Sequence, residues 1–258
     1  MSVLGWLLAC GPSTPEEATT ISQLEKFELS ALTELSIRDK GFGPEVATSL
    51  VENATSLKVL DASGNLLGAT GAATLASLSL ESLHLGPGRI WVEGNRIGSK
   101  GARGLLAAPD GTLVELDLSK NQIHGDAFEV VNHPLVTLVV DSNEVGDEGC
   151  IAIARIPGLK KLHMGWSGVG DACAAALASH ATLEELLLSS NDLGDEGAIA
   201  LSKMPSLKTL YVSNNQITDV GARALLGLER LNLDGNPLTD LDGIQADFEG
   251  EWLSIEML

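Results

Sequence analysis

The sequence predicts an α/β repeat protein, and three observations support that prediction. One leucine pattern recurs in register from Ala31 onward. The segments between its copies carry apolar residues every three or four positions, as an amphipathic helix requires. Apolar residues make up 44% of the 258-residue chain but aromatic residues only 3%, so the core must form by regular packing of aliphatic side chains. We therefore expect stacked units that share one continuous core.

The recurring pattern is Leu-x-x-Leu-x-Leu-x-x-Asn-x-Leu. Its nine copies begin at Leu32, Leu57, Leu80, Leu113, Leu135, Leu159, Leu183, Leu207 and Leu228. The period is 21 to 33 residues, and the unit from Leu80 contains an insertion at residues 86–94. The pattern resembles that of leucine-rich repeat proteins of the ribonuclease-inhibitor-like class, over residues 31–243. The resemblance implies a horseshoe-shaped solenoid of about nine repeats, with a curved parallel sheet on the concave face and helices on the convex face.

The two ends of a solenoid must be covered, because terminal repeats would otherwise expose the core. Residues 23–30 are interpreted as an N-terminal capping helix. Residues 244–258 are interpreted as a C-terminal cap in which four apolar side chains cover the last repeat, namely Phe248, Trp252, Ile255 and Leu258. We therefore expect residues 23–258 to form a single domain.

The first 22 residues have a different character. An apolar run ends in Leu7-Leu8-Ala9-Cys10 and is followed by residues rich in Pro, Ser, Thr and Glu. It resembles a bacterial lipoprotein signal, which implies that Cys10 is lipidated, that residues 11–22 are a tether, and that the chain lies in the cell envelope. The run is short and has no preceding Lys or Arg, so the alternative is a short apolar capping helix in a cytoplasmic protein. With no run of 18 apolar residues, we expect membrane attachment only through such a lipid.

The charge of the chain excludes one class of partner. The formal net charge is −19, from 35 acidic and 16 basic residues, and it repels the phosphate backbone of nucleic acids. A basic protein surface is the partner that this field would attract. We expect a monomer that binds a protein partner.

The acidic strings look like sites but recur with the repeat. The thirteenth position of five units is aspartate, at Asp147, Asp171, Asp195, Asp219 and Asp240. We expect each to accept hydrogen bonds from the free N–H groups of the helix that it begins, so a metal site or a catalytic acid pair is not expected here. The histidines lack metal-ligand spacing, and Ser167 lacks the glycine of a nucleophile elbow. We expect no catalysis, no cofactor and no metal.

Two further sets of residues are assigned to the scaffold. The asparagines at the ninth position are expected to pair with backbone groups where the chain leaves each strand. Cys150 and Cys173 are expected to be small buried thiols, and the alternative is a reactive pair.

Function is expected on the concave face, where the side chains between the leucines project. The fifth position brings four apolar or aromatic side chains together beside Trp166 at an eighth position, namely Val139, His163, Leu187 and Tyr211. Asp117 and Asp141 belong to the more acidic first half, and Trp91 lies in the insertion. Such a patch is typical of protein-interaction hot spots, so we expect a non-catalytic binding scaffold. The alternative is a regulator of a partner enzyme, because the class includes Ran GTPase-activating proteins and ribonuclease inhibitor; none of their functional residues can be matched here.

Overall fold

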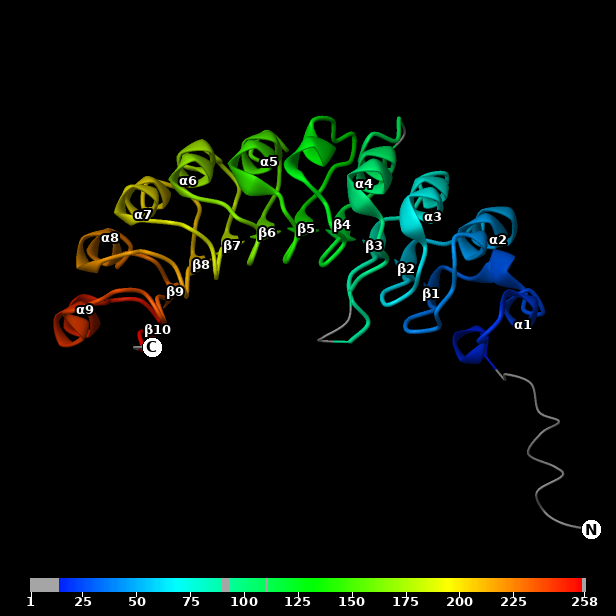
Figure 1. The fold of residues 1–258 in the computed structure, drawn as a ribbon, viewed down its shortest axis with the longest axis horizontal. Helices are drawn as coiled ribbons and strands as arrows, with labels where there is room; N and C mark the ends of the chain where they lie inside the picture. Colours follow the sequence, from blue (N-terminus) through cyan, green and yellow to red (C-terminus); the bar gives the residue numbers. More distant parts are fainter. Residues whose placement is uncertain (1–13, 90–92, 110, 257–258) are drawn as a thin grey trace, which may run out of the picture.

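The computed structural model describes residues 14–89, 93–109 and 111–256. Ten strands in these residues form one parallel sheet, in which every strand pairs with the next one along the chain. Figure 1 shows this sheet on the inner side of an open arch, with the helices on the outer side. The predicted α/β solenoid with a concave sheet and a convex helical layer is confirmed.

Each strand is three residues long. The strands are β1 (Glu34–Ser36), β2 (Val59–Asp61), β3 (Ser82–His84), β4 (Glu115–Asp117), β5 (Thr137–Val139), β6 (Lys161–His163), β7 (Glu185–Leu187), β8 (Thr209–Tyr211), β9 (Arg230–Asn232) and β10 (Trp252–Ser254). The α-helices are α1 (Ile21–Leu24), α2 (Glu45–Asn53), α3 (Gly68–Leu75), α4 (Gly98–Leu106), α5 (Gly146–Ile153), α6 (Asp171–Leu177), α7 (Asp195–Leu201), α8 (Asp219–Ala224) and α9 (Leu241–Asp247). The 3-10 helices are η2 (Pro15–Glu17), η3 (Leu29–Ala31) and η4 (Gly125–Phe128), the last of which stands where an α-helix lies in the other repeats.

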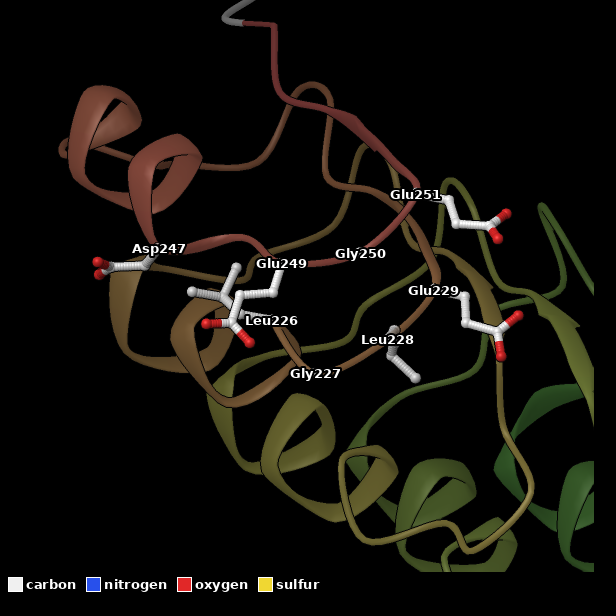
Figure 2. Close-up of a pocket in the computed structure, with 8 residues that line it drawn as sticks. All are labelled: Leu226, Gly227, Leu228, Glu229, Asp247, Glu249, Gly250 and Glu251. Carbon is white, nitrogen blue, oxygen red and sulfur yellow. The ribbon is translucent and has the colours of Figure 1, made fainter.

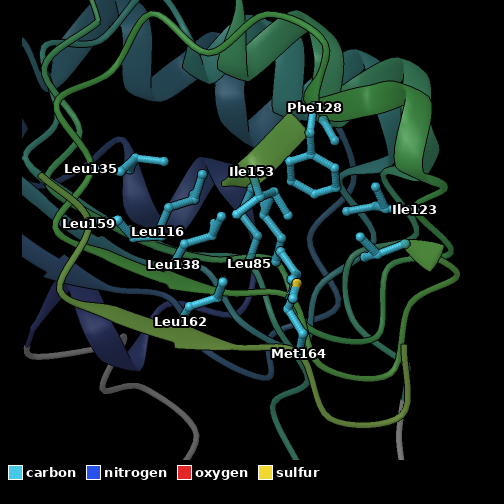
Figure 3. Packing of buried hydrophobic residues seen from close by; sticks show 14 of the residues in the cluster. Leu85, Leu116, Ile123, Phe128, Leu135, Leu138, Ile153, Leu159, Leu162 and Met164 are labelled. Carbon is cyan, nitrogen blue, oxygen red and sulfur yellow. The ribbon is translucent and has the colours of Figure 1, made fainter. Parts of the chain in front are cut away.

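The middle residue of each repeat strand is a leucine that points away from the concave face. Leu116, Leu138 and Leu162 are completely buried on β4, β5 and β6. Figure 3 shows these three side chains stacked in a row, with Phe128 and Ile153 from the helical side packed over them. Because strand side chains alternate, the residues on either side of each leucine face the opposite way, toward solvent.

The asparagines of the ninth position, which we call the asparagine ladder, pair with backbone groups as predicted. The amide oxygen of Asn143 accepts hydrogen bonds from the backbone N–H groups of Asn121 and Ile123, both at 3.0 Å. Its amide nitrogen donates to the carbonyl oxygens of Leu118, at 3.0 Å, and Val140, at 2.9 Å. Each asparagine of this kind therefore joins its own repeat to the preceding one and leaves few buried backbone groups unpaired.

The aspartates of the thirteenth position act differently from the prediction. Asp195 lies in the first turn of α7, and its carboxylate accepts hydrogen bonds from the backbone N–H groups of Thr218, at 2.8 Å, and Gly221, at 2.9 Å, at the start of α8. Asp171 does the same for the start of α7. Only Asp240 accepts a hydrogen bond from its own helix, from Gly243 at 3.1 Å. The expectation that each caps its own helix is therefore wrong for most of the column, which instead joins consecutive repeats.

The two central cysteines form a disulfide, so the expectation of free thiols is wrong. The bond joins Cys150 on α5 to Cys173 on α6, and both residues are completely buried. The repeat explains the pairing. Cys150 occupies a repeat position that is alanine in other units, and Cys173 occupies a position that is glycine in other units. These two positions face each other between the helices of consecutive repeats. One repeat later, a Cβ atom built on Gly197 would lie 3.3 Å from the Cβ atom of Ala174. Two cysteines at such facing positions are within bonding reach, since disulfides need a Cβ–Cβ separation of roughly 3.5 to 4.5 Å.

The N-terminal cap is interrupted, whereas a continuous helix was predicted. The expected helix over residues 23–30 is replaced by the single turn of α1 and by η3, with Leu24 and Leu29 buried against the first repeat. Glu25 ends α1 and donates its backbone N–H back into that turn.

The C-terminal residues add a tenth strand to the sheet. β10 pairs in register with β9, so that Trp252 lies beside Arg230 and Leu253 beside Leu231. The expectation that Trp252 covers the core is wrong, because the aromatic ring lies on the concave side, whereas Phe248 and Ile255 do pack on the core.

Three expected features, Cys10, Trp91 and Leu258, lie outside the described residues. Among the helices that are described, none has the length and apolar character needed to cross a membrane.

Candidate protein-binding face

The fifth position of the repeats forms a continuous row across the concave face. Asp117 is in register with Val139, Val139 with His163, His163 with Leu187, and Leu187 with Tyr211. Neighbouring strands lie about 4.8 Å apart, so these side chains are direct neighbours. All of them are partly exposed. The structure thus brings together the four predicted residues Val139, His163, Leu187 and Tyr211, which we call the concave patch.

Charged residues of the third position border the concave patch. The imidazole Nε2 of His163 lies 2.9 Å from a carboxylate oxygen of Glu185, and the ammonium of Lys161 lies 3.3 Å from the other oxygen. Partial burial by itself would raise the pKa of Glu185, but the hydrogen bonds and positive charges of His163 and Lys161 together hold that pKa below its ordinary value. The patch therefore has a fixed, ionised carboxylate at its rim.

An aromatic pair that was not expected extends the concave patch toward the C-terminus. The ring of Trp252 lies 5.5 Å from that of Tyr211 in a tilted arrangement, and the guanidinium of Arg230 stands 5.6 Å from the centre of the Trp252 ring. The spacing of Leu253 and Ile255, which matches the fourth and sixth positions of the repeat, was the available signal, but Gly250 replaces the first leucine of the pattern.

The concave face beside Val139 is acidic and its carboxylates are hydrogen-bonded: Asp117 belongs to the row, and Asp141 lies two residues after Val139. The carboxylate of Asp141 accepts a hydrogen bond from the backbone N–H of Gly165 at 2.6 Å. Burial raises the pKa of Asp141 and the negative charge of Asp117 adds to the increase, against the opposing effects of the Gly165 hydrogen bond and of His163. Asp117 accepts hydrogen bonds from the hydroxyl of Ser119, at 2.6 Å, and from its backbone N–H, at 2.8 Å.

A pocket of about 410 Å³ opens on this acidic half. It is lined by Arg38, Ser63, His84, Pro87, Asp117, Ser119, Lys120, Val139, Asp141 and Ser142. One wall comes from the beginning of the insertion, which is held in place because Arg38 Nε donates a hydrogen bond to the carbonyl oxygen of Gly88 at 3.0 Å. The insertion therefore contributes to the concave face through its N-terminal end, at Pro87 and Gly88.

Trp166 does not join the concave patch. Its side chain is 70% exposed and lines a second pocket, of about 400 Å³. That pocket is lined by Glu93, Lys120, Gln122, Ser142, Asn143, Glu144 and Trp166, and by none of the four residues of the patch. The prediction placed Trp166 beside the patch, whereas the structure turns it toward the insertion.

A third hollow at the C-terminal end is lined by carboxylates that do not converge on one point (Figure 2). It is lined by Leu226, Gly227, Leu228, Glu229, Asp247, Glu249, Gly250 and Glu251. Figure 2 shows its carboxylates pointing in different directions, and Asp247 is already paired with Arg223. Within the described ranges, no group of three or more His, Cys, Asp or Glu side chains is arranged to hold a metal ion.

The repeats match two known sequence profiles. One, described as Leucine rich repeat, matches residues 181–238, and another of the same description matches residues 112–127 and 131–154. The chain is a leucine-rich repeat protein. No protein of the curated set matches the sequence significantly.

Solved structures share the fold of this leucine-rich repeat protein at low sequence identity. An internalin (inlF) from Listeria monocytogenes is 20% identical, with a TM-score of 0.54, over 79% of this chain and 55% of the internalin. Rad7 from yeast, solved in complex with Elc1, is 16% identical, with a TM-score of 0.51, over 81% of this chain and 71% of that chain. The match thus spans about half the length of the internalin. Leucine-rich repeat folds commonly mediate protein–protein interactions, and such proteins are typically non-catalytic scaffolds.

Proposed function

We propose that this protein binds a protein partner through its concave face and has no catalytic activity of its own. The observation that supports this most directly is the in-register row Val139, His163, Leu187 and Tyr211. In a chain with 3% aromatic residues, this row and Trp252 gather two aromatic rings on one side of the sheet. Partly exposed aromatic and aliphatic side chains with a charged rim are the usual centre of a protein interface.

The partner is expected to present a basic surface to the first half of the row. Asp117 directly precedes Val139 in the row, Asp141 lies two residues after Val139 in the same repeat, and the chain carries a net charge of −19. Complementary charge of this kind raises the association rate and fixes the orientation of a partner more than it adds affinity.

A photo-crosslinking experiment tests the proposal. A benzophenone amino acid replaces Leu187 on the concave side or Val220 on α8, which is 63% exposed on the convex side. We expect crosslinks to one defined protein from position 187 and not from position 220, and loss of that product when Val139, His163 and Tyr211 are also changed to Ala. Equal crosslinking from both positions would contradict the concave-face proposal.

The alternative role, regulation of a partner enzyme, would use the same face. It differs from a passive scaffold in one measurable way, because a regulator changes the turnover of its partner. The turnover of the partner identified by crosslinking is measured with the wild-type chain and with the variant in which Val139, His163 and Tyr211 are changed to Ala. A regulator changes that turnover only as the wild-type chain, whereas a passive scaffold leaves it unchanged.

We also infer that the chain functions in an oxidising compartment. The Cys150–Cys173 disulfide is fully buried between two helices, and disulfides of this structural kind persist mainly outside the reducing cytosol. This agrees with the envelope location that Cys10 predicts. The test is alkylation of acid-quenched cells followed by mass spectrometry. A linked peptide pair is expected, whereas alkylation of both thiols would contradict the inference.

A further inference from the structure

The second pocket, around Trp166, is separate from the concave patch. We propose that it binds the guanidinium group of an arginine side chain presented by the protein partner, an inference that rests on the proposed function. The pocket lies where the chain leaves β4, β5 and β6, beside Glu93 near the C-terminal end of the insertion. Lys120 and Ser142 line both this pocket and the acidic pocket of the concave face, so a segment bound on that face passes next to Trp166.

Trp166 occupies a backbone position that does not suit it. The eighth position of the repeats is left-handed in eight units, and Trp166 has a φ of +55°. The other members of this column are polar residues or glycine, namely Asp39, Gly64, Lys120, Ser142, Ser190, Asn214 and Gly235. A bulky residue in this region costs free energy, and such strain is concentrated at functional sites.

The exposure of Trp166 shows that burial does not compensate for this cost. The side chain is 70% exposed, although a tryptophan normally buries most of its surface. The following residue, Ser167, takes the place of the ladder asparagine and is almost completely buried, so the turn itself is closed without the indole. The indole face is therefore available to a ligand.

Two carboxylates stand at the same pocket and make it selective for a cation. Glu93 and Glu144 line it together with the single ammonium group of Lys120, so the lining is net negative. Their present partners are exposed: Arg96 lies 3.0 Å from Glu93, and His124 lies 3.3 Å from Glu144. Exposed ion pairs contribute little free energy, so an incoming guanidinium can replace them at low cost.

A guanidinium fits this set of groups better than other cations. It is planar, it stacks on an indole face by a cation–π interaction, and its fork of N–H donors matches a carboxylate. The Arg96–Glu93 pair already shows a guanidinium on one of the two carboxylates. The Gln122 amide, which donates to Glu93 at 3.3 Å, holds that carboxylate at the pocket.

The test uses small molecules and does not need the partner. N-acetyl-arginine methylamide is titrated into the ¹⁵N-labelled protein while the indole N–H signal of Trp166, assigned with Trp166→Phe, is followed by NMR. N-acetyl-citrulline methylamide, a neutral compound of nearly the same shape, is the control. We expect a saturable shift with the arginine compound and at least about tenfold weaker binding of the citrulline compound, about 1.4 kcal/mol. An unmoved signal, or equal binding of both compounds, would overturn the proposal.

Variants separate this site from the concave patch. Glu93→Gln combined with Glu144→Gln should weaken arginine binding at least about fivefold, while Glu196→Gln, an exposed first-turn residue of α7, should leave it unchanged. Replacing Val139, Leu187 and Tyr211 by Ala should also leave arginine binding intact. If the triple Ala variant loses the partner but still binds arginine, the loss reports on the concave face alone and the arginine site stands. If the double Gln variant binds arginine as tightly as the wild type does, the arginine site is refuted.

Discussion

Leu138 and Val139 are adjacent in β5, yet they belong to columns with opposite behaviour. Leu138 is fully buried, and its column is leucine in every repeat strand of the sheet. Val139 faces the concave side, and its column holds acidic, aliphatic, imidazole and phenol side chains between Asp117 and Tyr211 alone. The inward columns are uniform because the stacked units share one core, and the outward columns are free to differ. Function is therefore sought where an outward column departs from its neighbours.

The sharpest test of this contrast compares the two neighbours. Leu138→Ala removes a fully buried side chain between two stacked repeats and should lower the free energy of unfolding by about 3 kcal/mol. Val139→Ala should lower it by less than about 0.5 kcal/mol, because the side chain is already partly in water. Urea unfolding followed by circular dichroism measures both. Similar losses for the two variants would mean that the concave column also carries the fold.

Loss of the disulfide should have the next largest effect on the free energy of unfolding, and it tests two buried positions of the repeat. Cys150→Ala with Cys173→Gly restores the residues that the repeat uses at these positions, so packing is kept and only the crosslink is lost. Because the crosslink closes a sequence separation of 23 residues, its loss should lower the free energy of unfolding by about 3 kcal/mol. The comparison is made with and without a reducing agent. A wild-type chain that is equally stable in both conditions would show that the bond does not form.

The repeat pattern alone was enough to predict the strands, the inward leucines and the asparagine ladder, because each follows from periodicity. It also placed Val139, His163, Leu187 and Tyr211 next to one another, since a parallel sheet in register aligns equal positions. These features depend only on the spacing of residues along the chain.

The features that could not be predicted depend on contacts between consecutive repeats. The sequence around Asp195 indicates the helix that Asp195 begins. It does not indicate that the carboxylate accepts hydrogen bonds from N–H groups at the start of the next helix. The pairing of Cys150 with Cys173 requires knowing that the alanine and glycine columns face each other. Trp166 was assigned to the concave patch because the eighth position follows the strand, but the left-handed turn directs it toward Glu93 and Glu144.

Removal of the Asp195 carboxylate should have a smaller effect, which depends on pH. Desolvation would raise the pKa of Asp195, but the hydrogen bonds from Thr218 and Gly221 outweigh it and lower that pKa. The carboxylate thus stabilises the fold above the ordinary pKa of 3.8, and this contribution is lost as the pH falls through the lower folded value. Asp195→Ala should cost about 1 kcal/mol at pH 7 and less near pH 3. Asp192→Ala, an exposed neighbour that accepts one hydrogen bond from Gln216, is the control and should cost almost nothing.

Asp141 on the concave face should show the opposite sign. Burial raises its pKa, so the folded chain binds a proton there more readily than the unfolded chain does, and acidification toward the raised pKa favours folding. Asp141→Asn keeps an acceptor for the Gly165 N–H and removes the charge, so it should leave the free energy of unfolding at pH 7 unchanged or raise it by under about 1 kcal/mol. Asp195→Asn, measured at the same pH, should lower it. A clear loss of stability in the Asp141 variant would show that this charge stabilises the fold. A neutral result or a gain would mean that the fold does not need the charge, which supports a role of this carboxylate in binding on the concave face.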